Sequence, residues 1–291
     1  MLQTSVATSA EPYIPGRARS EVIRKALAYA VVILVALIFF VPFVWTLITS
    51  FKTIPDSVNV SLIPHPWTTS AWRTIWTDYD FKRYIENSLF LAVVIVGCNL
   101  VLAGLGGYAF ARLKFPGREL LFLLVLGTLM VPDQLRLIPV FVMLTNWHLI
   151  GNFSGYIFIN LVTATNLFLM RQYFLTIPKD FEEAAKLDGA GYFKTFWRIM
   201  LPLALPAIST LVILQFQGTW NDFFWPLILF GQGSPSHYTV QLGLAELRFT
   251  YSTLWPQICA GSLIAILPVL AIFLAFQRYF VGGVVSAGVK G

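Results

Sequence analysis

The sequence contains little charge. Only 12% of its 291 residues are Asp, Glu, Lys or Arg, whereas 57% are hydrophobic and the mean hydropathy is +0.72. Soluble domains carry roughly 25% charged residues, because a folded surface must be solvated. A water-soluble globule is therefore excluded. Disorder is also excluded, because 25 Phe, 11 Tyr and 9 Trp give far more apolar surface than an unfolded chain exposes. A polytopic membrane protein remains.

Cysteine and histidine are scarce as well. The two cysteines, Cys98 and Cys259, lie in apolar runs without a CxxC, and the three histidines stand far apart without an HExxH. A disulfide scaffold and a zinc site are thus excluded. No GxxxxGK[ST] phosphate loop is present, so no ATP site, metal or other cofactor is expected in this chain. The net charge of +6 does not indicate nucleic acid, because the basic residues are scattered between apolar segments.

Six segments are long and apolar enough to cross a membrane, whose hydrocarbon core needs about 20 residues of helix. They cover residues 26–49, 87–111, 119–144, 153–170, 203–230 and 255–279. The first is too long for a signal-peptide core and lacks a cleavage pattern, so we expect it to be retained. The predicted fold is an all-α membrane helix bundle with six transmembrane helices.

The basic residues predict how the bundle is oriented. With the N-terminus inside, 14 of the 20 Lys and Arg residues lie in cytoplasmic segments, as expected because basic loops resist translocation. Both termini are therefore predicted to be cytoplasmic, as tails over residues 1–25 and 280–291, with disorder over the first 20 residues. Residues 50–86 form a long outer segment, interpreted as a folded loop packed on the helices in preference to a dedicated binding site.

Small residues form a stripe on the second span. Ala103, Gly107 and Ala111 recur at intervals of four, which allows two membrane helices to approach closely. The stripe predicts helix packing and says nothing of function.

The cytoplasmic loop at residues 177–206 has an unusual pattern. Asp180 and Glu183 have the spacing of a capping box and Gly189 is a natural helix stop, which predicts a helix over residues 181–188. A second amphipathic stretch contains Tyr192, Phe193, Phe196, Trp197 and Met200, and Pro202 and Pro206 lead into the fifth span. Two short amphipathic helices indicate either a docking surface or an interfacial pair lying on lipid headgroups.

The same loop carries a family signature. Glu183-Ala184-Ala185, Gly189, Ile199 and Leu201-Pro202 resemble the EAA signature of permease subunits in bacterial ABC importers, in residue type and in spacing over twenty positions. Shorter matches are Tyr108 to Arg112, Phe115-Pro116-Gly117 and Trp220-Asn221-Asp222. From Ile85 onward the chain looks like the core of the carbohydrate-uptake permeases, specifically the six-span subunit of the maltose-importer type.

The resemblance implies a fold and a mechanism. The fold would be that of type I ABC importer permeases, with the core at residues 87–279 and the coupling loop at 177–206. In the family the short loop helix sits in a cleft of an ATP-binding subunit, and ATP-driven closure switches the bundle between inward-facing and outward-facing states. The residues implied in ATPase coupling are Glu183, Ala184, Ala185, Asp188, Gly189, Ile199, Leu201 and Pro202. The family's C-terminal tail also reaches toward the ATPases, although Gly282 to Val285 departs from the usual pattern.

The partners follow from the same resemblance. They would be a second, different permease, two ATP-binding subunits that hold ATP and Mg, an extracytoplasmic solute-binding protein and membrane lipid, in the bacterial inner membrane. The chain itself would be a permease subunit and not an enzyme. The outer segment at residues 231–254, with Glu246 and Arg248, would contact the solute-binding protein or serve as a plain connecting loop.

Polar residues inside the spans mark a candidate translocation path, because such groups are costly in lipid and usually face the bundle interior or a water-filled cavity. The full set is Asn99, Asp133, Gln134, Arg136, Asn160, Thr163, Asn166, Gln215, Gln217, Asn221 and Asp222. The substrate-pathway candidates chosen are Asn99, Gln134, Asn160, Gln217, Trp220, Asn221 and Asp222, with Trp220 and Phe224 expected to stack on sugar rings. Several of these residues could instead hold helices together, and Asp133 and Arg136, three apart, could pair with each other.

Three alternatives stay open on the sequence alone. Glycerol 3-phosphate importers share the architecture and the loop, although a single Arg136 inside a span favours a neutral sugar. An ion-coupled secondary transporter would be expected to show an inverted repeat, and none is visible. A membrane scaffold or receptor without transport would not co-purify with an ATPase.

Overall fold

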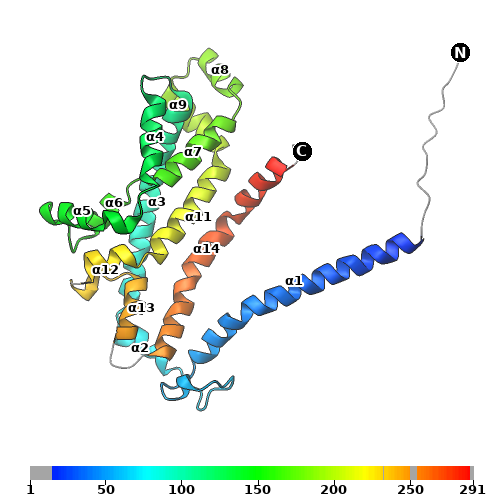
Figure 1. Ribbon diagram of the computed structural model, residues 1–291, viewed down its shortest axis with the longest axis vertical. Coiled ribbons are helices and arrows are strands. Elements are labelled where there is room, and N and C mark those ends of the chain that lie inside the picture. Colours follow the sequence, from blue (N-terminus) through cyan, green and yellow to red (C-terminus); the bar gives the residue numbers. More distant parts are fainter. Residues whose placement is uncertain (1–14, 232, 250–253, 289–291) are drawn as a thin grey trace.

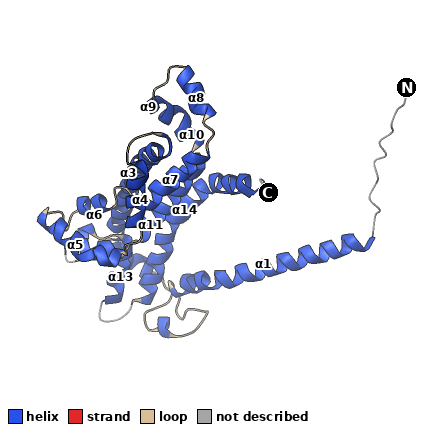
Figure 2. Ribbon diagram, turned by 45° about the horizontal axis from the view of Figure 1, so that its top comes forward, coloured by secondary structure: helices blue, strands red, loops and turns tan. Residues whose placement is uncertain are grey.

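The computed structural model describes residues 15–231, 233–249 and 254–288, and every regular element within these ranges is a helix (Figure 2). The longer helices are α1 (Pro15–Thr49), α2 (Ser70–Thr77), α3 (Phe81–Arg112), α4 (Arg118–Thr128), α5 (Asp133–Asn146), α6 (Phe153–Ile159), α7 (Ala164–Thr176), α8 (Asp180–Leu187), α11 (Leu205–Asn221), α12 (Phe224–Phe230), α13 (Val240–Phe249) and α14 (Trp255–Gly288). Shorter elements are η1 (Asp56–Val58), α9 (Tyr192–Thr195), the π-turn η2 (Phe196–Met200), α10 (Leu201–Leu203) and η3 (Pro235–His237). The all-α prediction is confirmed.

The predicted tails are partly helical. Helix α1 begins at Pro15, so the disorder predicted through residue 20 is wrong from residue 15 onward, and residues 15–25 of the predicted tail are helical. Proline suits a first helical turn, because its φ is already helical and no N–H is needed there. Helix α14 continues to Gly288, so most of the predicted tail at 280–291 is also helical. Residues 1–14 and 289–291 lie outside the described residues.

The membrane spans consist of continuous helices and bent pairs. Val22–Thr49, Phe81–Arg112 and Trp255–Tyr279 are each long and apolar enough to cross a membrane. Three pairs meet the same test only together: α4 with α5, α6 with α7, and Tyr192–Leu203 with α11, which are bent by 99°, 43° and 77°. By length and composition, the described residues give six spans when each bent pair is one span. This agrees with the sequence prediction.

The third predicted span is not one helix. It breaks between Thr128 and Asp133, where the chain turns by 99°. Pro132 has no N–H and disfavours helical backbone at Val131, which explains the position of the break. Helix α4, with 11 residues, is about 16 Å long and cannot cross the membrane alone. Figure 1 shows α5 turned aside from the axis that α4 follows.

The fourth and fifth spans also differ from the prediction. The fourth breaks at residues 160–163 and then continues as α7 to Thr176, beyond the predicted end at 170. The fifth, predicted over residues 203–230, ends at Asn221, and the chain continues as the separate helix α12. Asp222 has extended backbone, and its Oδ1 accepts a hydrogen bond from the amide of Trp225, 3.3 Å away. A side-chain acceptor there satisfies a free amide in the first turn of α12.

Helix α3 lies at the centre of the bundle, packed against α7 and α11, while α14 packs against α11 and α2. The small-residue stripe forms the contact with α7, since Ala103, Gly107 and Ala111 are all buried. A Cβ at Gly107 would lie 2.6 Å from the Cβ of Met170, so only glycine permits this approach. The packing predicted from the stripe is confirmed.

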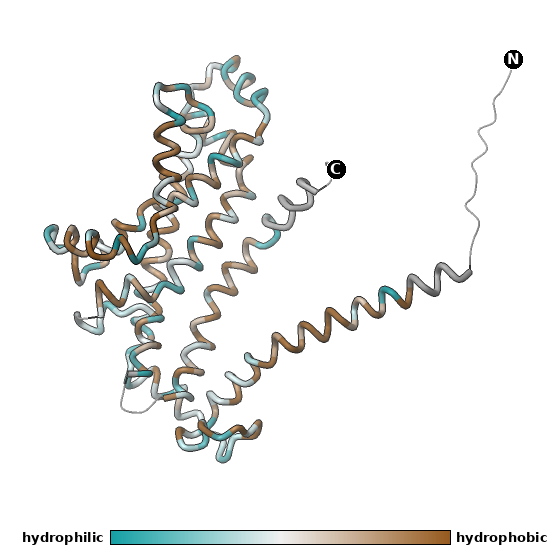
Figure 3. Tube along the Cα trace, in the orientation of Figure 1, coloured by the Kyte–Doolittle hydropathy of each residue, from teal (hydrophilic) through white to brown (hydrophobic). Residues whose placement is uncertain are grey.

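Helix α1 leaves the bundle at a wide angle, and in Figure 3 its apolar residues follow one another along most of its length. The apolar window of this helix is 0% buried. Its outer end is fixed by the segment that follows: the Trp72 Nε1 donates to Ser50 Oγ at 3.2 Å, and the Lys52 Nζ donates to the Asn59 carbonyl at 2.9 Å. With η1 and α2 inside it, the outer segment at 50–86 is folded and packed on α14, as expected.

Candidate functional site

A short helix stands at one end of the bundle, where Figure 1 shows α8 at the top, beyond the end of α7. Helix α8 matches the helix predicted over residues 181–188 to within one residue. Gly189 ends it with a φ of +73°, and the amide of Ala190 bonds back to the carbonyl of Ala185 at 2.9 Å. The helix end inferred from Gly189 is therefore confirmed.

The start of α8 differs from the prediction. Lys179 occupies the N-cap position and makes no side-chain cap bond, whereas Asp180 is already the first helical residue. The predicted capping box of Asp180 and Glu183 is therefore wrong. Asp180, Glu182 and Glu183 instead place three carboxylates in the first turn, where the positive end of the helix dipole favours them.

The surface of α8 suits a protein partner. Glu183 and Ala184 are exposed, and Leu187, an apolar residue, is 90% exposed at the tip. Phe181, Tyr192 and Phe193 are exposed beside it. Large apolar side chains that gather on one polar surface mark an interaction site.

The structure divides the eight candidate coupling residues between two places. Five belong to α8 and its end: Glu183, Ala184, Ala185, Asp188 and Gly189, of which only Ala185 is buried. The other three, Ile199, Leu201 and Pro202, lie in η2 and α10, on the return to the bundle. In the second amphipathic stretch Phe196 and Met200 are buried, while Tyr192, Phe193 and Trp197 are exposed.

Glu182 was not among the candidate site residues, yet it is the residue that attaches α8 to the bundle. Its Oε2 lies 3.3 Å from the Nε of Arg112, and its Oε1 accepts a hydrogen bond of 3.0 Å from the hydroxyl of Tyr108. The Arg112 guanidinium also donates to the carbonyl of Ile177. Tyr108 and Arg112 are the ends of the five-residue motif in the sequence analysis, and their i, i+4 spacing was the available signal.

A second feature is a cavity of about 840 Å³ in the middle of the bundle, between the α4–α5 bend, the α6–α7 bend, α11 and the start of α12. Of the seven pathway candidates, Gln134, Asn160 and Asp222 line it. Phe224, expected to stack on a sugar ring, lines it as well.

The other four pathway candidates lie elsewhere. Trp220 is 1% exposed, stacks on Phe216 and donates its Nε1 proton to the carbonyl of Ala265, so its ring is enclosed in the core. Asn221 is exposed and accepts a hydrogen bond from Gln241. Gln217 faces a different cavity, between α11 and α14. Asn99 is fully buried behind the cavity wall.

Asn99 holds the α6–α7 bend. Its Nδ2 donates to the carbonyl of Asn160 at 2.8 Å, and its Oδ1 accepts from the amide of Thr163 at 2.9 Å. These backbone groups lose their helical partners at the bend, and in a membrane interior nothing else would satisfy them. Asn166 then links Asn99 to Gln215, with Nδ2 distances of 3.1 Å and 2.7 Å to the two side-chain oxygens. The bend is thus built from side chains of three helices.

The cavity lining carries little charge. Its charged residues are Asp133, Arg136 and Asp222, and Asp133 and Arg136 form an ion pair, as the sequence predicted. Asp222 accepts a hydrogen bond of 2.8 Å from the hydroxyl of Tyr156. The remaining polar lining consists of amides and hydroxyls, including Thr219, which sequence reasoning missed although it lies four residues after Gln215 on the same helix face. Such a surface can hydrogen-bond a neutral, hydroxyl-rich solute.

Comparisons with known proteins agree with this architecture. Residues 100–285 match the family described as binding-protein-dependent transport system inner membrane component. The arabinooligosaccharides transport system permease protein AraQ of Bacillus subtilis is 38% identical over 72% of this chain and 74% of its own length. The sn-glycerol-3-phosphate transport system permease protein UgpE of Yersinia enterocolitica is 31% identical over 79% of this chain and 84% of its own.

A solved structure shows the same fold. A chain of a bacterial ABC transporter involved in the import of the acidic polysaccharide alginate superposes with a TM-score of 0.77, at 24% sequence identity, over 92% of this chain and 99% of that chain. The alternatives that do not belong to this architecture, a secondary transporter and a scaffold, receive no support from these matches.

Proposed function

Because this chain belongs to the family of inner membrane components of binding-protein-dependent transport systems, we propose that it is a permease subunit of an ATP-driven importer of di- or oligosaccharides. It would form half of a translocation pathway together with a second, different permease. Helix α8 carries this proposal, because it exposes a family signature on a surface that suits a protein partner.

The coupling residues act through α8. Glu183 is exposed and available to a basic group on an ATP-binding subunit, and Ala184 permits close approach of that surface. Gly189 fixes where α8 ends. Two ATP-binding subunits would hold ATP and Mg and hydrolyse the nucleotide, and their closure would move α8 and switch the bundle by alternating access. Both termini would then be cytoplasmic, like α8, and the solute-binding protein would dock on the opposite side.

The cavity favours a neutral sugar over a phosphate. Gln134, Asn160 and Asp222 line it, and its one cationic side chain, Arg136, is already paired with Asp133. A phosphate would find no unpaired cation in this lining, because the remaining ionisable residue, Asp222, is a carboxyl group and cannot neutralise an anion. Amides and hydroxyls can pair with sugar hydroxyls, and Phe224 offers an aromatic face.

Uptake by the purified complex tests the proposal. The chain is co-expressed with its second permease and ATP-binding subunits and reconstituted in proteoliposomes with the solute-binding protein. The probe mixture contains arabinotriose, maltotriose, diacetylchitobiose and glycerol 3-phosphate. ATP-dependent accumulation of a neutral sugar is expected. Accumulation of glycerol 3-phosphate alone would refute the sugar class, and failure of any ATP-binding subunit to co-purify would refute the importer assignment.

A further inference from the structure

Helix α8 has few apolar contacts with the rest of the chain. Ala185 is its only buried residue within the described part of the chain, while Leu187 is 90% exposed and Phe181 45% exposed. One buried methyl group contributes about 1 kcal/mol, which is too little to keep a helix in register with the bundle while a partner moves it. Another contact must therefore transmit the motion of α8.

The ion pair between Glu182 and Arg112 supplies this contact. The two side chains are only 13% and 5% exposed, so salt and water screen them far less than a surface pair. The bond from Tyr108 and the Arg112 bond to the Ile177 carbonyl fix both partners, and Ile177 precedes the linker into α8. Helix α8 and its linker are thereby attached to one helix of the bundle, α3.

Helix α3 extends from this attachment to the opposite end of the molecule. It has 32 residues without proline, so it is about 48 Å long. It is buried along one face against α7 and α11. A continuous helix without a break moves as one body, in contrast to the three bent pairs around it.

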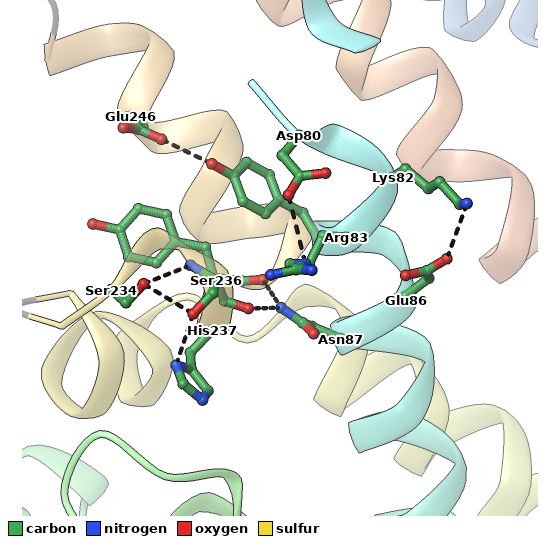
Figure 4. A network of polar contacts seen from close by, with 11 residues as sticks. Asp80, Lys82, Arg83, Glu86, Asn87, Ser234, Ser236, His237 and Glu246 are labelled. Atoms are coloured by element: carbon green, nitrogen blue, oxygen red, sulfur yellow. Dashed lines mark hydrogen bonds and ion pairs between the residues drawn. The ribbon is translucent and has the colours of Figure 1, made fainter. Parts of the chain in front are cut away.

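The outer end of α3 holds a second segment, residues 234–249, which comprises η3 and α13 and is called the outer cap below (Figure 4). The Asn87 Nδ2 donates to the carbonyls of Ser236 and Tyr238 at 2.8 Å and 2.9 Å. The Ser88 hydroxyl accepts from the amide of Val240 at 2.8 Å, and the Tyr84 hydroxyl donates to Glu246 at 3.3 Å.

Close packing completes this attachment. A Cβ at Gly243 would lie 2.2 Å from the ring of Tyr84, so α13 sits directly against α3. The outer cap is therefore joined to α3 by hydrogen bonds from α3 side chains, mostly to its backbone, and by a helix contact that leaves no room for a side chain at Gly243.

We infer that α3 is the rigid link through which α8 and the outer cap move together, with Glu182 as the positioning residue at its cytoplasmic end and Asn87 at its outer end. The inference deepens the proposed function and rests on it: ATP-driven movement of α8 is transmitted to the face that meets the solute-binding protein, and docking there is transmitted back. Energetic coupling of this kind is reciprocal.

The test uses the complete reconstituted importer and measures ATP hydrolysis with and without the solute-binding protein, loaded from the probe mixture above. Glu182→Gln removes the negative charge that pairs with Arg112. Asn87→Leu keeps the branched shape of the side chain but removes the amide group that donates to the outer cap. Each variant is expected to lower the stimulation by the binding protein at least about fivefold while basal hydrolysis is retained. A merely structural defect would instead lower both rates in parallel.

The double variant separates a link from two local effects. If α3 connects the two ends in series, detaching either end already stops transmission, so Glu182→Gln combined with Asn87→Leu is no worse than the worse single variant. If the double variant loses stimulation by the product of the two single-variant factors, the inference is overturned. Matched controls are Glu119→Gln, which breaks ion pairs that do not involve α8, and Lys82→Ala, which breaks the exposed pair with Glu86 on α3 itself.

The remaining outcomes are also decisive. Both controls are expected to respond like the wild type, and a Glu119→Gln variant as impaired as Glu182→Gln would overturn the assignment of Glu182. So would wild-type stimulation in Glu182→Gln, or loss of the ATP-binding subunits from its purified complex. A wild-type complex without any stimulation would overturn the proposed function itself, which distinguishes that failure from failure of the link.

Discussion

Replacing Asn99 by leucine should destabilise the bundle without emptying a space in it. Leucine has the same branched shape as asparagine, with two methyl groups in place of the amide oxygen and nitrogen, so the change removes hydrogen bonds and leaves no cavity. Lost are the bonds of the Nδ2 to the carbonyls of Asn160 and Ile95, and those that the Oδ1 accepts from Thr163 and Asn166. The Asn160 carbonyl and the Thr163 amide then remain unsatisfied at the α6–α7 bend.

Two estimates of the cost agree. Leaving two buried backbone groups unpaired costs about 1–3 kcal/mol each, or roughly 2–6 kcal/mol. Asn99 makes five hydrogen bonds in all, including one from the Thr163 hydroxyl. At the average of about 0.6 kcal/mol measured inside membrane proteins they give roughly 3 kcal/mol, because the unfolded chain in the membrane also finds partners. A loss of about 2–4 kcal/mol satisfies both. At about 2–4 °C per kcal/mol, the apparent unfolding temperature should fall by about 5–15 °C.

Thermal unfolding of the detergent-solubilised protein, followed by size-exclusion chromatography after heating, measures this shift. Asn146→Leu is the matched control, because it makes the same replacement at an exposed residue at the end of α5. The control should unfold within about 1 °C of the wild type, as surface substitutions usually do. If Asn99→Leu unfolds with the control, the buried amide does not hold the bend and the reasoning is refuted.

Four further substitutions test the two sites and the helix packing. Glu183→Lys and Gly189→Val should leave the protein in the membrane but abolish uptake coupled to ATP hydrolysis. The first reverses an exposed charge on α8, and the second forces a β-branched residue to a φ of +73°. Normal uptake in proteoliposomes would exclude the coupling role. Gly107→Leu should abolish folding or lower the yield of folded protein severalfold, because its Cβ would meet Met170 at 2.6 Å; unchanged elution as a single peak would contradict the packing. Gln134→Leu should raise the KM for sugar uptake roughly tenfold with an unchanged unfolding temperature, and an unchanged KM would remove Gln134 from the pathway.

Local signals predicted helix α8, in the loop at residues 177–206, well. Gly189 marks its end whatever surrounds it, because positive φ is a property of that residue's own backbone. The start was predicted wrongly, because a capping box requires a particular N-cap geometry, and the three acidic residues of the first turn are compatible with more than one starting residue. Breaks within spans were missed for a similar reason, since hydropathy over a window of 20 residues does not register a turn at Pro132.

The hydrogen-bond partners of the buried polar groups could not be predicted from the sequence. Asn99 and Asn166 are 67 residues apart, and Arg112 and Glu182 come from different helices, so no local pattern joins them. Trp220 matched a family pattern together with Asn221 and Asp222, yet of these three only Asp222 lines the cavity. The pattern identified the segment, and the end of α11 at Asn221, after which the backbone is extended, decided which residue faces the cavity.

The sequence by itself determined that the chain lies in a membrane, and it predicts the side that faces the cytoplasm. The scarcity of charge, the long apolar segments and the unequal distribution of Lys and Arg between the two sides are enough for this. Whether a segment enters lipid or stays in water depends on its own composition and not on the residues that later pack against it. Only the tertiary structure decided that Glu182 attaches α8, that Asn99 supports a bend, and that Gln134, Asn160 and Asp222 face one cavity. A polar side chain in a membrane takes its role from the backbone groups and side chains packed against it, and helix packing alone brings these together.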